Sequence, residues 1–277
     1  EFPLSDILFK CKPYLLVVSS FCIGFIKNLS MMFIKKFLFL FCFYLVSCSQ
    51  IKPINSEQII EKSISAYGWD KKNFSITFDF RDYKYKLIRK PVFFSFQRSK
   101  VNEGIAIVDV MTSENKLNRT MEGKSIKLTD SIINLYSSSL NSVMYFFQLP
   151  NPLKDDAVVS ELLGTTKILG KDYWSIKVTF NKVGGGNDFK DEYRYWIDKD
   201  NFHIAFFAYN YLTDGGGVRF RKAKNIRDIN GFLFQDYVNY KPKIRSTPLD
   251  SLPILFQKDS LQIVSTIENK IIKIEIQ

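Results

Sequence analysis

The chain has 277 residues, of which 46% are apolar, 16% aromatic and 24% charged, a composition that supports a large hydrophobic core. This composition excludes an intrinsically disordered chain, and 13 glycines with 9 prolines exclude a collagen-like one. The formal net charge is +11, but basic and acidic residues are interleaved, so attraction to anionic lipid headgroups or a solvated basic surface is expected ahead of a nucleic-acid surface.

The N-terminal region contains an apolar run, residues 37–46, directly after a pair of lysines. This is the pattern of a secretory signal peptide, and the run is too short to span a bilayer. We therefore predict a signal peptide over residues 31–47. Residues 1–30 are expected to be upstream translation or a non-structural extension, and an anchor helix over residues 14–26 is the alternative.

All four cysteines lie in the first 48 residues, so the rest of the chain can form neither an internal disulfide nor a thiolate metal site. The last of them ends the sequence Leu-Val-Ser-Cys, residues 45–48, which resembles the bacterial lipobox. The resemblance implies that Cys48 is lipidated and that residues 48–56 form a tether. Ser49 follows the cysteine in place of an aspartate, which implies the outer membrane and its periplasmic face. A buried, unmodified cysteine is the alternative.

After the tether, the sequence predicts one helix and then a series of strands. The helix covers residues 56–67, with isoleucines on one side, Ser56 as N-cap and Gly68 after its end. The segments that follow are rich in aromatic and β-branched residues and are separated by turn sequences. They predict strands over residues 74–80, 83–88, 92–97 and 105–111.

A second helix interrupts the strands. Residues 129–147 place apolar side chains three and four positions apart, and Pro150 and Pro152 end the pattern. A short helix is predicted over residues 250–256, and a final strand over 261–276 breaks at Glu268-Asn269. The strands between these two helices are predicted over residues 161–169, 173–180, 192–198, 203–212, 218–225 and 232–240.

Frequent turn sequences and only two substantial helices predict an α+β fold: a single large curved antiparallel sheet, or half-barrel. The N-terminal helix and the inserted helix are expected to cover its concave side. We predict one domain over residues 57–277. Because residues 202–212 are apolar on both faces and few helices are available to cover them, the sheet is expected to curl around an apolar cavity.

The order of elements, together with the lipobox, resembles the LolA/LolB-like fold of periplasmic lipoprotein carriers and receptors. Four segments also resemble an uncharacterised family of bacterial outer-membrane lipoproteins. They are Gly184-Gly185-Gly186 with Asp188, Tyr195-Trp196, residues 213–220 and residues 235–240. The resemblance to this family implies no established activity.

A cavity of this kind favours an apolar ligand, such as an acyl chain, a lipid or a lipidated protein. Burial of the ligand's acyl chain would supply affinity, at about 25 cal/mol per Å² of apolar area before the costs of association are subtracted. The aromatic residues expected to line the cavity are Phe78, Phe94, Trp196, Phe206, Phe207, Tyr209 and Tyr237.

Two glycine triplets, residues 184–186 and 215–217, are expected at the same end of the sheet from the directions of the strands. A polar cluster at the mouth of the cavity would bind a headgroup, a phosphate or a cation. Two glycine turns with solvated charges are the alternative. The polar residues expected there are Asp188, Asp191, Asp214, Arg219 and Arg221.

The sequence contains no familiar catalytic or metal-binding signature. Neither glycine triplet is followed by Gly-Lys-Ser/Thr, and His203, the only histidine, has the neighbours of a packed strand residue. We expect no cofactor, metal, nucleic-acid partner or catalytic residue. Two alternatives remain open: a periplasmic hydrolase acting through the acidic and arginine cluster, and a structural or partner-binding lipoprotein without a ligand.

Overall fold

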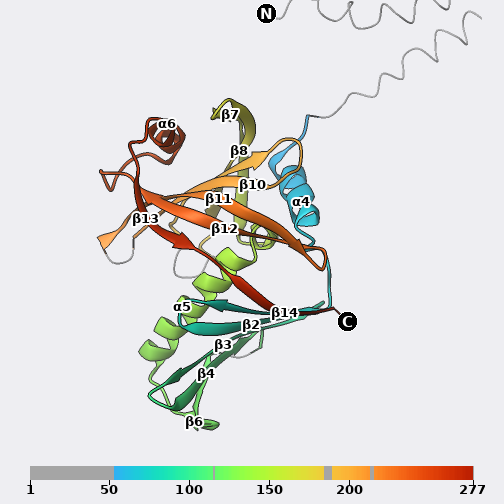
Figure 1. Ribbon diagram of the computed structural model, residues 1–277, viewed down its shortest axis with the longest axis vertical. Helices are drawn as coiled ribbons and strands as arrows, with labels where there is room; N and C mark the ends of the chain where they lie inside the picture. Colours follow the sequence, from blue (N-terminus) through green and yellow to red (C-terminus); the bar gives the residue numbers. More distant parts are fainter. Residues whose placement is uncertain (1–52, 115, 184–188, 213–214, 277) are drawn as a thin grey trace, which may run out of the picture. The chain divides into compact units, whose positions relative to one another are not determined.

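The computed structural model describes residues 53–114, 116–183, 189–212 and 215–276, and its elements are labelled as in Figure 1. The unit Ile54–Gln277 is compact. In the described residues of this unit, the chain forms fourteen strands and three α-helices, joined by short connections.

Helix α4 (Ser56–Ala66) opens the unit and buries its isoleucines, as the pattern predicts. Its N-cap is Asn55, so the prediction of Ser56 was wrong by one residue. Asn55 Oδ1 accepts a hydrogen bond from Gln58 N at 2.9 Å, and Gln58 Oε1 accepts one from Asn55 N at 3.2 Å, which makes a capping box. Ser56 is buried instead, and its hydroxyl donates to Ser160 O at 3.3 Å.

The first sheet contains seven antiparallel strands in the order β14-β1-β2-β3-β4-β5-β6. Its predicted strands are confirmed, but the β5–β6 hairpin was not predicted, because its short polar segments show no apolar alternation. The strands are β1 (Phe74–Phe80), β2 (Tyr83–Lys90), β3 (Phe93–Asn102), β4 (Ile105–Thr112), β5 (Asn118–Met121), β6 (Lys124–Ile126) and β14 (Lys270–Ile276).

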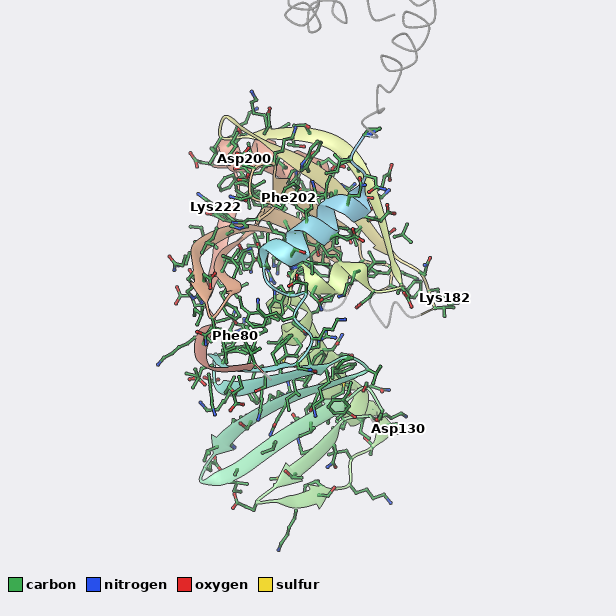
Figure 2. The ribbon with its side chains drawn as sticks, turned by 90° about the vertical axis from the view of Figure 1, so that its right-hand side faces the viewer. Phe80, Asp130, Lys182, Asp200, Phe202 and Lys222 are labelled. Atoms are coloured by element: carbon green, nitrogen blue, oxygen red, sulfur yellow. The ribbon has the colours of Figure 1, made fainter. Side chains whose placement is uncertain are left out.

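Helix α5 (Asp130–Phe147) confirms the predicted inserted helix and packs against both sheets. Figure 2 shows Asp130 at its start beside the first sheet, and Phe80 where the two sheets meet. Near its end, Phe147 stacks on Phe78 of β1 at a centroid distance of 3.7 Å and on Phe234 of the second sheet at 5.8 Å. No helix in the described ranges, α5 included, is both long and apolar enough to cross a membrane.

The second sheet also has seven antiparallel strands, in the order β13-β12-β11-β10-β9-β8-β7. A 3₁₀ turn, η2 (Asn151–Lys154), leads into it from α5. All of its predicted strands are confirmed. They are β7 (Val158–Ile168), β8 (Lys171–Phe180), β9 (Tyr193–Asp198), β10 (Ile204–Tyr211), β11 (Gly217–Ile229), β12 (Phe232–Lys241) and β13 (Gln262–Ile267).

The predicted α+β class with open antiparallel strands is confirmed, although hydrogen bonding divides the strands between two sheets. The chain crosses from one to the other at Glu268-Asn269, where the sequence predicts a break. Asp236 of β12 holds this junction, because its Oδ1 accepts from Asn269 N at 3.2 Å and from Arg227 Nη2 at 3.1 Å. Arg227 Nη2 also donates to Asn269 O. The strands therefore separate at a point fixed by hydrogen bonds.

Two hydrophobic clusters pack on opposite faces of the second sheet. The first lies on the side of α4, α5 and the first sheet. The second lies under η4 (Leu249–Ser251) and α6 (Leu252–Gln257). On β10, Phe207 stacks 5.8 Å from Phe146 of α5, whereas Phe206 lies 5.6 Å from Phe256 of α6. Helices therefore cover both faces of β10. The sequence predicted the short helix α6, but it did not predict that this helix packs on the second face of the sheet.

Candidate functional site

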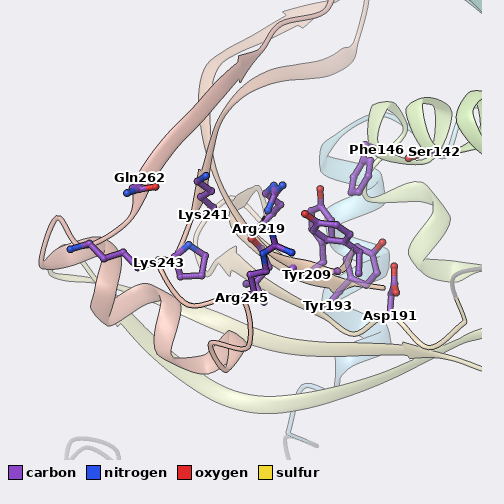
Figure 3. A pocket seen from close by; sticks show the side chains of 15 residues that line it. Ser142, Phe146, Asp191, Tyr193, Tyr209, Arg219, Lys241, Lys243, Arg245 and Gln262 are labelled. Carbon is purple, nitrogen blue, oxygen red and sulfur yellow. Dashed lines mark hydrogen bonds between the residues drawn. The ribbon is translucent and has the colours of Figure 1, made fainter. Parts of the chain in front are cut away.

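A pocket of about 710 Å³ opens on the face of the second sheet that packs against α5, and we call it the outer pocket (Figure 3). Strands β9, β10 and β11 supply most of one side, α5 supplies part of the other, and the segment after β12 closes the rim. Its aromatic lining residues are Phe146, Tyr193, Tyr209 and Tyr211, which we call the aromatic wall.

The sheet register explains why the aromatic wall forms. Tyr193 of β9 pairs with Tyr209 of β10, and Tyr209 pairs with Arg219 of β11. Residues paired across antiparallel strands point to the same face, so these three side chains form a row across the sheet. The Tyr209 ring lies 5.3 Å from the rings of both Tyr193 and Phe146, measured between centroids. The wall is thus continuous from the sheet to the helix.

Four basic side chains border the aromatic wall, and in Figure 3 they lie on the side of the segment after β12. The guanidinium of Arg219 lies 5.0 Å from the Tyr211 ring and joins the two groups. Asp191, which is buried, is the one acidic residue among the described lining residues. The pocket therefore attracts anions. This basic rim consists of Arg219, Lys241, Lys243 and Arg245.

A second pocket, of about 210 Å³, lies between α5 and residues of both sheets, and we call it the inner pocket. It shares Ser142, Phe146 and Tyr209 with the outer pocket, so the two pockets are neighbours. Its other lining residues are Phe80, Arg81, Val143, Phe147, Arg221, Tyr237, Ile267 and Asn269.

Arg221 of β11 is the buried charge of the inner pocket, with 8% of its surface exposed. Its guanidinium carbon lies 4.2 Å from the centroid of the Phe146 ring and 5.2 Å from those of Phe207 and Tyr209. Its Nη2 donates to Tyr209 Oη at 2.8 Å. In the described part of the chain no carboxylate pairs with this guanidinium, and its Nε is buried without an acceptor.

Three buried tyrosines, Tyr237, Tyr145 and Tyr195, stay neutral because burial raises their pKa values. Burial raises the pKa of Tyr237 to about 12. Burial likewise raises the pKa of Tyr145 and of Tyr195, whose hydroxyl oxygens lie 3.5 Å apart. Because none of these phenols ionises near neutral pH, none of them balances the charge of Arg221.

The structure brings five of the sequence-predicted residues to these two pockets. Asp191 and Arg219 line the outer pocket, Arg221 and Tyr237 line the inner pocket, and Tyr209 lines both. The cluster that the sequence placed at one mouth is therefore divided between two neighbouring pockets.

The other predicted aromatic residues lie elsewhere. Phe78 and Phe207 are buried in the first hydrophobic cluster, and Trp196 and Phe206 are buried in the second, on the opposite face of the sheet. Phe94 packs within the first sheet, at the edge of the first cluster. These five side chains line neither pocket.

Several predicted features lie outside the described residues: Cys48, Asp188, Asp214 and the first glycine triplet. His203 packs edge-on against Tyr67 at a centroid distance of 5.6 Å and lines neither pocket. Across the described ranges, no three His, Cys, Asp or Glu side chains come together as a group that could hold a metal ion.

Sequence reasoning missed three residues of the aromatic wall (Phe146, Tyr193 and Tyr211), three residues of the basic rim, and Arg81 of the inner pocket. A signal for the rim was present, because Lys-Pro-Lys-Ile-Arg, residues 241–245, places three cations directly after a predicted strand. The pairing of that strand with β11, which brings the run beside Arg219, could not be read from its composition. Phe146 was visible only as part of an amphipathic helix whose docking site was unknown.

Comparison with known proteins finds one matching family and several solved structures of low sequence identity. A LolA superfamily protein from Nitrosomonas europaea matches at 12% identity over 81% of this chain and 94% of its own, with a TM-score of 0.48. A DUF1329 family protein from Desulfovibrio piger matches at 10% identity over 79% and 92%, with a TM-score of 0.40. A domain described as outer membrane lipoprotein-sorting, from Vibrio parahaemolyticus, matches at 9% identity over 80% and 94%, with a TM-score of 0.42.

The predicted resemblance to an uncharacterised family is confirmed, because the family whose model matches this chain is one of unknown function. No curated protein matches the chain in sequence. The profile of DUF6503, a family of unknown function, matches residues 34–269, and the chain belongs to this family.

Proposed function

We propose that the protein binds an amphiphilic ligand, such as an acyl chain, a lipid or a lipidated protein, with its apolar part against the aromatic wall. The observation that carries this proposal is the outer pocket, in which four aromatic and four basic side chains border a volume of about 710 Å³. Pockets that hold small molecules usually have volumes of about 300–1,000 Å³. The rings favour an apolar chain, and the surrounding cations favour an anionic group.

The aromatic wall suits an amphiphile because tyrosine carries both an apolar ring and a polar hydroxyl. A chain that buries about 200 Å² of apolar surface gains about 5 kcal/mol before the costs of association are subtracted. Tyr193 and Tyr209 provide ring surface on the sheet, and Phe146 provides it from the helix. Binding would therefore depend on the position of α5 as well as on the sheet.

We further propose that the protein is anchored through lipidated Cys48 to the outer membrane and faces the periplasm. In this arrangement residues 31–47 are the signal peptide, the tether begins at Cys48, and the compact unit that starts at Ile54 is the binding domain. The lipobox supports the proposal, and the family match begins at residue 34 and so includes both the apolar run and the cysteine. Two or three acyl chains on one residue give a stable anchor.

Lipidation is tested by growing cells with an alkynyl fatty acid and detecting the label on the purified protein. We expect Cys48→Ser to abolish the label, because the acyl chains need this thiol, and Cys42→Ser to retain it. Loss of label in both variants, or retention in both, would contradict the anchor.

Ligand binding is tested by mass spectrometry of organic extracts from the mature chain, residues 48–277 with Cys48→Ser. Both sheets and both hydrophobic clusters lie in this part of the chain. We expect a lipid at close to one molecule per protein. Ser142 is exposed and lines both pockets, so Ser142→Trp should block them and remove most of the lipid.

Asn141→Trp is the matched control, because Asn141 is the preceding exposed residue of α5 and lines neither pocket. It should leave the amount of lipid unchanged. An extract without lipid, or equal amounts from the two tryptophan variants, would argue against the outer pocket as the binding site.

A further inference from the structure

The inner pocket carries positive charge that none of its described lining residues balances. Arg81 comes from the turn between β1 and β2, Arg221 comes from β11, and among the lining residues that the structure describes there is no aspartate or glutamate. Five of the other lining residues are aromatic. A buried charge is normally paired, so a pocket with the buried Arg221, the exposed Arg81 and no described anion is suited to a negatively charged group.

Arg221 is the more deeply placed of the two arginines. Its guanidinium lies over the rings of Phe146, Phe207 and Tyr209, and one of its nitrogens donates to the Tyr209 hydroxyl. Within the described ranges its Nε has no acceptor. Asn239, the residue paired with Arg221 on β12, has its Oδ1 buried with no donor among the same residues. Buried polar atoms without partners are uncommon, and here two of them occur side by side on neighbouring strands.

We propose that Arg221 binds the oxyanion of a single-chain anionic amphiphile, with Arg81 as the second cation. The charged end of the ligand lies in the inner pocket, and its chain passes Phe146 and Tyr209 into the outer pocket, which shares both residues. The ligand class is a carboxylate or a phosphate monoester on one apolar chain, in preference to a neutral lipid. Arginine suits this role because its planar N–H groups match the two oxygens of such anions.

This inference rests on the proposed function, because it requires the apolar chain of the ligand to lie in the outer pocket. The test uses three ligands with the same chain length, hexadecanoate, hexadecyl phosphate and hexadecanol, each competing with the neutral dye Nile red for the mature chain with Cys48→Ser. We expect at least one anion to bind about tenfold or more tightly than the alcohol, because a hydrogen bond to a charged group is stronger than one between neutral groups. The preferred anion distinguishes a fatty acid from a phosphorylated chain.

The variant Arg221→Gln should bring the affinity ratio of anion to alcohol close to one. Lys222→Gln is the matched control, because it removes one positive charge from the next residue on the opposite face, where Lys222 lies 5.6 Å from the Phe256 ring. Circular dichroism establishes that each variant is folded. If Arg221→Gln does not fold, Arg221→Lys keeps the charge, loses the planar pair of donors and should lower the ratio.

The possible failures are distinct. Failure of all three ligands to displace the dye would overturn the proposed function together with this inference. Equal affinity for all three ligands would be consistent with binding of the apolar chain of the ligand, but it would overturn the role of Arg221. A preference that survives Arg221→Gln and is lost in Arg219→Gln would place the anion at the basic rim, which also overturns the assignment to the inner pocket.

Discussion

Asp109→Asn is expected to lower the free energy of unfolding by about 3–5 kcal/mol, the usual cost of breaking a buried ion pair. Asp109 of β4 is 1% exposed and lies between two arginines. Its Oδ2 accepts from Arg98 Nε and from Arg119 Nη2, both at 2.8 Å, and its Oδ1 accepts from Arg119 Nε at 2.7 Å. Asparagine preserves the shape but leaves both guanidinium groups without their counter-ion. Urea unfolding followed by circular dichroism measures the loss.

The effect should extend to helix α5, because the same arginines hold it on the first sheet. Arg98 Nη1 donates to Ser139 Oγ at 2.9 Å, and the guanidinium carbon of Arg119 lies 3.7 Å from the Tyr136 ring. Both partners belong to α5. The triad of Arg98, Asp109 and Arg119 thus helps to position α5, the helix that carries Phe146.

Asp79→Asn is the matched control. Asp79 pairs with Lys84 at 3.0 Å, but their side chains are 38% and 53% exposed, so this pair should contribute less than about 1 kcal/mol. Similar losses for the two aspartates would show that the Asp109 triad is no more stabilising than a surface pair.

The dependence on pH provides an independent check on Asp109. Burial acts to raise the pKa of this carboxyl, but the hydrogen bonds and charges of Arg119 and Arg98 outweigh it and hold the pKa below its ordinary value. A group with a lowered folded-state pKa stabilises the protein above its unfolded pKa of about 3.9, and this contribution is lost as the pH falls through the folded-state pKa. The stability of the wild type should therefore fall more steeply below about pH 4 than that of Asp109→Asn.

Gly68→Ala is expected to destabilise the protein by about 3 kcal/mol, the sum of backbone strain and a steric clash. Gly68 ends the first helical segment with φ at +70°, and an added Cβ would lie 2.0 Å from Gly231 O in the turn between β11 and β12. The two segments are also joined by Leu233 N donating to Tyr67 O at 3.1 Å. For a unit of this size, the midpoint of thermal unfolding should fall by about 6–12 °C.

Gly123→Ala separates the two contributions. Gly123 has a similar φ of +74°, but no atom lies within 4 Å of the position of its Cβ. Its substitution should cost only the backbone strain, about 1–2 kcal/mol. If both alanine variants melt at the same temperature, the contact between Gly68 and the β11–β12 turn does not limit stability.

Most elements of the fold could be predicted because their patterns are local. The alternation of residues 74–80 and the spacing of residues 129–147 each determine an element without reference to the rest of the chain. The division into two sheets depends on how Asp236 holds the junction at Asn269, which is a contact between distant residues. The place of α6 could not be predicted either, since a six-residue helix has no pattern that identifies its partner strand.

The candidate site was predictable only in part, for the same reason. Tyr209 was predicted to line the cavity and Arg219 to lie at its mouth, and the pairing of β10 with β11 places these two residues opposite one another. Phe206 and Phe207 are adjacent residues of the same type, so they lie on opposite faces of β10. Phe206 packs under α6, and Phe207 packs against α5. Sequence alone cannot decide which face meets a pocket.

The hydrogen bonds that Asp236 makes next to the end of β13 also bear on the proposed ligand binding, because they fix part of the inner pocket. Ile267 and Asn269, on either side of the crossing, belong to the wall of the inner pocket, and Asn269 is held by both Asp236 and Arg227. The position of this part of the wall is therefore set during folding. For the proposed ligand this preorganisation would lower the cost of ordering the pocket, so more of the interaction energy would appear as affinity.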